Sequence, residues 1–153
     1  MKKLLLLLFL ISSGSLFAQQ QAQINWLSFE QLSDSLAIKP KKVLLFFHTD
    51  WCSFCRKMQN EVFTDQHIID KINTDYYAVQ FDAESVDSVH FDNQVFINPV
   101  AKKRTGKYHQ LTTLLAAQKG KYIFPTTILL DADFTVKARF FQYLGRDKLN
   151  GIL

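Results

Sequence analysis

Apolar segments of strand length recur along the chain and indicate a buried sheet. The run 43–47 is apolar at every position, which is typical of a central strand covered on both faces. Residues 76–82 predict a second buried strand. Residues 126–130 and 135–141, joined by Asp131-Ala132-Asp133, predict an antiparallel pair.

Apolar residues between these strands recur at helical spacing and predict helices. The stretches with this spacing are 28–37, 55–63, 65–72, 108–118 and 145–153. Ser28 and Thr64-Asp65 carry the hydroxyl or carboxylate oxygens that cap helix N-termini, so we expect helices to begin there. The helix 108–118 is expected to bury Tyr108, Leu111, Leu114 and Leu115.

Residues 83–105 interrupt this alternation of strands and helices. Residues 89–91 and 95–97 flank Asp92-Asn93, a pattern that predicts a β-hairpin insert. Such an insert usually extends a sheet or covers a core, but loops on a rigid scaffold also select partners, and both interpretations stay open. A βαβ unit followed by ββα indicates an α/β fold, with a central mixed sheet covered by helices on both faces.

The first 18 residues have the organisation of a secretory signal peptide. A basic start, Met1-Lys2-Lys3, precedes an apolar run over 4–11, and small residues lead to a cleavage site after Ala18. The apolar run is shorter than the roughly 20 residues that span a bilayer, which argues against a membrane anchor. We therefore expect an exported, periplasmic protein with one domain over 19–153.

Composition and charge exclude several classes of protein and of binding partner. Of 153 residues, 48% are hydrophobic and 21% charged, which excludes a disordered chain. The net charge is +4, but removing Lys2 and Lys3 leaves 16 basic against 14 acidic residues, so neither nucleic acid nor a membrane surface is an expected partner. Only two cysteines are present, too few for a disulfide-built miniprotein.

Both cysteines lie in Trp51-Cys52-Ser53-Phe54-Cys55, where the first predicted strand ends and a helix begins. Unpaired N–H groups at a helix N-terminus stabilise a thiolate. The first sulfur is expected to be exposed there, with the second one turn inward. We therefore predict that Cys52 is the nucleophile and that Cys55 resolves the mixed disulfide.

Two other interpretations of the cysteine pair remain open. A structural disulfide is possible outside the cytosol, although so short a loop stabilises a fold little. A metal site would need further ligands, and the histidines available are His48, His67, His90 and His109. Because none of these shows a paired ligand spacing, we expect neither a metal nor a cofactor beyond the redox-active Cys52–Cys55 pair.

The whole pattern resembles the thioredoxin superfamily, in particular exported bacterial thioredoxin-like proteins and the C-terminal domain of the periplasmic disulfide-reductant transporter. The resemblance rests on a buried strand, Trp-Cys-X-X-Cys, a distal Phe124-Pro125-Thr126 before a strand, and the order of elements. It implies a cis-proline at Pro125 facing the cysteine helix, with the backbone of Phe124 pairing with substrate. Trp51 joins these two residues as an expected substrate contact.

The sequence departs from thioredoxin at its buried charge pair. Phe46 stands where thioredoxin has an aspartate six residues before the first cysteine, and Ala78 aligns roughly with its partner lysine. Another group or water must then accept the proton of the resolving thiol. His48, on the same strand, is a candidate because an imidazole exchanges protons near neutral pH.

These observations predict an exported thiol–disulfide oxidoreductase that acts on protein disulfides, as a reductant or electron relay. Its expected partners are protein thiols and disulfides, including a membrane or periplasmic redox partner that recharges it, and it is expected to be a monomer. The alternative is a non-catalytic thioredoxin-fold binding module that holds a metal ion or a peptide.

Overall fold

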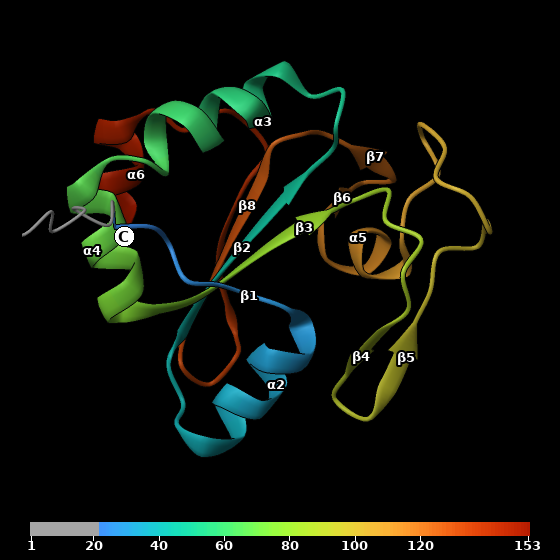
Figure 1. The fold of residues 1–153 in the computed structure, drawn as a ribbon, viewed down its shortest axis with the longest axis horizontal. Helices are drawn as coiled ribbons and strands as arrows, with labels where there is room; N and C mark the ends of the chain where they lie inside the picture. The colour runs from blue at the N-terminus through green and yellow to red at the C-terminus, as the bar shows by residue number, and fades with distance from the viewer. Residues whose placement is uncertain (1–21) are drawn as a thin grey trace, which may run out of the picture.

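The computed structural model describes residues 22–153 (Figure 1). The predicted signal peptide, residues 1–18, and the first residues of the predicted domain 19–153 lie outside the described residues. Within 22–153, no helix combines the length and the hydrophobicity that crossing a bilayer requires.

A five-stranded mixed sheet forms the centre of the molecule, in the order β1-β3-β2-β8-β9. Its strands are β1 (Trp26–Leu27), β2 (Lys42–His48), β3 (Tyr76–Asp82), β8 (Thr126–Leu130) and β9 (Val136–Phe140). β1, β3 and β2 are parallel, whereas β8 is antiparallel to both β2 and β9. The α/β fold with a mixed sheet is thus confirmed.

Helices cover both faces of this sheet (Figure 1). One face packs against α3 (Ser53–Lys57), the π-helical segment η1 (Met58–Val62), α4 (Gln66–Asp75) and α6 (Arg146–Ile152). The other packs against α2 (Phe29–Ile38) and α5 (Gln110–Leu115). Because β2 contributes side chains to both layers, its five central apolar residues are all buried.

Helices α2 and α4 begin at the capping residues that the sequence predicts. The Ser28 hydroxyl accepts from the backbone N–H of Gln31, whose side chain in turn accepts from the Ser28 N–H. The Asp65 carboxylate accepts from the N–H groups of His67 and Ile68 at the start of α4. These caps fix the ends of the two helices in separate layers.

The helix predicted over 108–118 is wrong in extent. Only Gln110–Leu115 is α-helical, and Leu114 is 65% exposed instead of buried. The chain then forms a short hairpin of β6 (Ala117–Gln118) and β7 (Lys121–Tyr122). Lys119 and Gly120 join these strands at φ 50° and 75°, a left-handed turn that reverses the chain after β6.

The predicted hairpin insert is present. β4 (Val89–Phe91) and β5 (Gln94–Phe96) pair antiparallel through Asp92 and Asn93, which have φ values of 51° and 58°. The hairpin rests on α2, because the Glu30 carboxylate accepts from the His90 N–H at 2.7 Å. It therefore covers the α2 layer and adds no strand to the central sheet.

Candidate functional site

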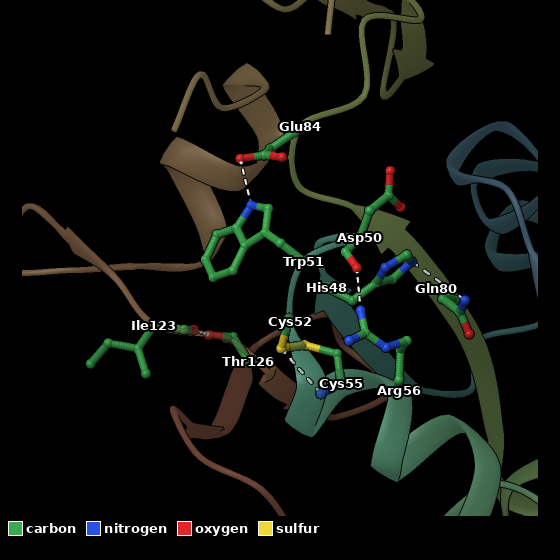
Figure 2. Close-up of a disulfide and its surroundings, with 10 residues drawn as sticks. All are labelled: His48, Asp50, Trp51, Cys52, Cys55, Arg56, Gln80, Glu84, Ile123 and Thr126. Atoms are coloured by element: carbon green, nitrogen blue, oxygen red, sulfur yellow. Dashed lines mark hydrogen bonds between the residues drawn. A yellow bond between two sulfur atoms is a disulfide. The ribbon is translucent and has the colours of Figure 1, made fainter. Parts of the chain in front are cut away.

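The two cysteines lie where the chain leaves β2 and begins α3, and they form a disulfide (Figure 2). Cys52 is the N-cap of α3, and its sulfur accepts a hydrogen bond of 3.1 Å from the N–H of Cys55. Such a donor favours negative charge on the Cys52 sulfur once the disulfide is reduced. The two sulfur atoms therefore lie in different environments, because Cys52 is at the N-terminus of the helix and Cys55 is in its first turn.

The expected exposure of the first sulfur is wrong. Cys52 is only 5% exposed and Cys55 is fully buried, so both belong to the hydrophobic layer that contains α3 and α4. Phe124 packs against the same layer. Of the two cysteines, Cys52 alone keeps a small exposed surface, and this is the opening through which a partner can reach the pair.

Two aromatic side chains meet beside the cysteines, at the carboxyl end of β2. Trp51 is half exposed, and its indole meets the ring of Phe124 edge to face, with centroids 6.1 Å apart. The Phe124–Pro125 peptide bond is cis, and the Pro125 ring is buried. The Thr126 hydroxyl donates to the carbonyl of Ile123 at 2.5 Å and closes the turn beside Cys52 (Figure 2).

A buried carboxylate holds the tryptophan. Glu84 is 2% exposed, and its Oε1 accepts from the Trp51 indole N–H at 3.1 Å and from the Gly106 N–H at 2.6 Å. Figure 2 shows Trp51 directed toward Glu84 and away from His48. One oxygen atom thus ties the residue before Cys52 to the segment that follows β5.

A second connection links the residues just before the cysteines to the same segment. The Lys103 ammonium donates to the carboxylates of both Asp50 and Asp82, and the Arg56 guanidinium donates to the Asp50 carbonyl. The hydrogen bond from Lys103 holds the pKa of the Asp50 carboxyl below its usual value. Burial alone would lower the pKa of Lys103, but the hydrogen bonds to Asp50 and Asp82 raise it.

His48 lies at the end of β2, on the face of the sheet that carries the cysteines. Its Nε2 is 3.4 Å from the side-chain nitrogen of Gln80 (Figure 2). Its ring stacks on that of Phe46, with centroids 5.9 Å apart. Burial lowers the pKa of His48, against the nearby charges of Asp82 and Asp50, which raise it. The lowered pKa favours the uncharged form of the imidazole.

The position facing Phe46 differs from the one that the sequence suggests. Phe46 pairs in register with Gln80 on β3, whereas Ala78 lies opposite Leu44. On the other side, Phe46 pairs with Thr127 of β8. An aspartate at position 46 would therefore face an amide and a hydroxyl, neither of which carries a positive charge.

The other histidines lie on separate elements. His67 is exposed on α4, His90 is exposed on β4, and His109 is fully buried as the N-cap of α5. Among the described residues, no three His, Cys, Asp or Glu side chains come close enough together to hold a metal ion.

Sequence reasoning missed Glu84 and Lys103. The position of Glu84 could have been predicted, because it comes directly after β3. β3 is parallel to β2, so the carboxyl ends of both strands lie at the same end of the sheet, where Cys52 also lies. No comparable signal exists for Lys103, which comes 21 residues after its partner Asp82 in an irregular segment.

Comparisons with known proteins agree with this geometry. A family model described as a thioredoxin-like domain matches residues 30–153. Among curated proteins, no sequence matches this chain.

Solved structures with the same fold include a DsbH oxidoreductase, 21% identical, with a TM-score of 0.57 over 86% of this chain and 83% of that one. A putative disulphide-isomerase from Bacteroides thetaiotaomicron is 18% identical, with a TM-score of 0.56 over 87% and 93% of the two chains. The DsbD C-terminal domain from Neisseria meningitidis, in its oxidised form, is 16% identical, with a TM-score of 0.50 over 79% and 86%. At these identities the likeness shows a shared fold.

Proposed function

The chain belongs to the thioredoxin-like domain family, and on that premise we propose that it is a thiol–disulfide oxidoreductase acting on the disulfides of other proteins. The observation that carries the proposal is the unequal placement of the two sulfurs, Cys52 at the N-cap of α3 and Cys55 buried in its first turn. A structural disulfide needs no such difference, whereas stepwise exchange does.

In the reduced protein, the Cys52 thiolate attacks one sulfur of the partner's disulfide. The partner's second sulfur leaves as a thiolate and takes up a proton, and a mixed disulfide with Cys52 remains. The Cys55 thiolate then attacks the Cys52 sulfur and releases the partner's first thiolate, so the partner gains two electrons and Cys52–Cys55 becomes oxidised. The N–H of Cys55 stabilises the Cys52 sulfur whenever it carries charge.

Three neighbouring residues are assigned to substrate contact. Trp51 and Phe124 form an aromatic rim beside the small opening at Cys52, and Pro125 lies buried directly behind Phe124. By the family's pattern, the backbone of Phe124 pairs with the substrate chain. His48 is proposed to accept the proton of Cys55, because its uncharged imidazole lies on the cysteine-bearing face of the sheet.

We assign the protein to export, on the signal-peptide pattern of residues 1–18. A reducing or relay role in that compartment requires a dithiol partner to return Cys52–Cys55 to the reduced state. The expected reduction potential is then nearer to the roughly −270 mV of thioredoxin than to the roughly −120 mV of a strong oxidant. Equilibration with glutathione and dithiothreitol buffers measures it, and a value near the oxidant end would reverse the assigned direction.

Trapping of intermediates tests the exchange reaction. Cys55→Ser should accumulate mixed disulfides when mixed with a disulfide-containing protein such as insulin, because Cys52 attacks and nothing resolves the product. Cys52→Ser should accumulate none, since Cys55 is fully buried. Mass spectrometry of unreduced samples counts the adducts, and matching denaturation midpoints for the two variants provide the control. Equal trapping by both variants would contradict the assignment.

A further inference from the structure

The segment 98–107, here called the basic loop, is closed at its base by a buried side chain. The Asn98 amide is 7% exposed and donates to the carbonyls of Ser85 at 2.9 Å and Lys107 at 3.1 Å. Directly outside this base, the Ile97 carbonyl accepts from the Gln110 N–H at 3.0 Å. The basic loop therefore leaves and rejoins the fold at fixed points.

Two contacts hold the basic loop against the residues that precede Cys52. Lys103 binds the carboxylates of Asp50 and Asp82, and the Gly106 N–H donates to Glu84, which also holds the Trp51 indole. Asp50 and Trp51 are the two residues immediately before Cys52. The basic loop thus forms a wall beside the two residues that lead into Cys52.

This wall carries positive charge toward solvent. Lys102, Arg104 and Lys107 are exposed, and within residues 22–153 none of them forms a salt bridge. The carboxylates at the same edge are already engaged, Asp50 and Asp82 by Lys103 and Glu84 by hydrogen bonds. The wall therefore offers cations, and no uncommitted carboxylate, to an approaching chain.

Resting on the proposed exchange reaction, we propose that the basic loop selects partner proteins that carry acidic residues beside the reactive cysteine. A carboxylate within a few residues of the partner's sulfur would lie against Lys102, Arg104 or Lys107 as that sulfur reaches Cys52. Complementary charge raises the rate of productive encounter and disfavours partners with basic flanks. This choice of partner is separate from the chemistry of Cys52 and Cys55.

Single-turnover reduction of model peptides tests the selection. Three peptides of one length carry the same disulfide flanked by glutamates, glutamines or lysines, and each is mixed with the reduced protein. Acid quenching, alkylation and mass spectrometry then count the Cys52–Cys55 disulfide formed. At low salt we expect the acidic peptide to react at least about tenfold faster than the basic one, with the advantage falling as salt screens the charges.

Matched variants locate the effect. The double variant Lys102→Gln, Arg104→Gln should lose most of the preference for the acidic peptide while reducing the glutamine peptide at the normal rate. The control variant Lys39→Gln, Lys137→Gln removes the same two positive charges from the opposite end of the sheet. Lys137 lies at that end because it directly follows the β9 residue that pairs with Leu130. This control should keep the preference for the acidic peptide.

Each outcome decides one question. Equal rates for the three peptides, a preference for the basic one, or equal loss of preference in both double variants would overturn the selection by the basic loop. Failure of the wild-type protein to reduce any of the three peptides would instead overturn the proposed exchange reaction. A preference confined to variants with an intact basic loop supports the inference.

Discussion

At the scale of single residues, Phe46 shows how this chain differs from thioredoxin. Its ring is fully buried among the rings of Trp26, Phe63 and His48, at centroid distances of 6.4, 4.9 and 5.9 Å. Thioredoxin has a carboxyl group at this position, whereas here an aromatic ring fills the layer that contains the cysteines. At this position, packing of an aromatic ring therefore takes the place of the buried carboxyl group of thioredoxin.

Restoring the acid should make stability depend on pH in a definite direction. In Phe46→Asp, a buried carboxyl without a cation has a folded-state pKa above its unfolded value of about 3.9. The resulting destabilisation is absent below pH 3.9, grows as pH rises toward the folded pKa, and is constant above it. Denaturant midpoints at pH 4 and pH 8 measure it, each relative to wild type.

Phe46→Asn provides the matched control for this prediction. It loses the same ring, at a cost of about 3–5 kcal/mol, but carries no group that titrates in this range. The free energy of unfolding of the Asp variant should therefore fall below that of the Asn variant at pH 8 and approach it at pH 4. A constant difference between the two variants would mean that position 46 is hydrated.

At the scale of elements, the short helix α5 depends on an uncharged histidine. His109 is fully buried, its Nδ1 accepts from the Leu111 N–H at 3.2 Å, and its Nε2 lies 3.1 Å from the Asp87 carbonyl. These contacts require a neutral ring with its proton on Nε2. Burial accordingly lowers the pKa of His109, although the backbone hydrogen bonds with Asp87 and Phe96 and the Asp87 charge act in the opposite direction.

This helix cap predicts a loss of stability in mild acid. Below pH 6.5 the unfolded chain binds a proton at His109 that the folded chain does not, so the free energy of unfolding falls as pH decreases toward the folded pKa. His109→Gln should be less stable at pH 7.5 by about 1–3 kcal/mol, because it disturbs a buried cap, and the deficit should shrink at pH 5.5. Denaturant unfolding at both pH values measures the change.

His67→Gln, on the exposed side of α4, is the control for that pair of measurements. It should alter stability little and change the slope with pH less than His109→Gln does. If the deficit of His109→Gln is the same at pH 5.5 and pH 7.5, the neutral cap on α5 is not the source of the pH dependence.

Elements were predictable from sequence where burial imposes a pattern. The apolar run of β2 and the apolar residues of β3 and β8 follow from burial in the central sheet, and the cap at Ser28 follows from side-chain chemistry. The two-residue strand β1 was missed because it is too short for any periodicity. The extent of the helix in 108–118 was misjudged because Ala117 and Gln118, at its end, pair as β6 with β7 across the turn at Lys119-Gly120.

The site residues likewise differ in how far the local sequence predicts them. Cys52 and Cys55 were identified from their spacing and their place between a strand and a helix, which local sequence encodes. Glu84 and Lys103 act through contacts made across 33 and 53 residues of chain, with Trp51 and Asp50 respectively, and only the folded arrangement brings them there.

At the scale of the whole molecule, stability should be concentrated in the centre of the sheet. β2 and β8 are buried along their length between two hydrophobic layers, whereas the hairpins β4–β5 and β6–β7 are short two-stranded units. In native-state hydrogen exchange, amides of β2 and β8 should open only with global unfolding, and those of the two hairpins by local opening. Central strands that exchange as fast as the hairpins would contradict this picture.

The two edge strands of the central sheet are protected against pairing with another copy of this protein. The sheet ends at β1, which has only two residues, and at β9, where Lys137 and Arg139 are exposed and the register shifts beside Leu129 and Leu130. A short edge, charged side chains and an irregular register all hinder strand addition from a neighbouring molecule. Both ends of the sheet are therefore protected against pairing with an extended chain, whether that chain belongs to another copy or to a different protein.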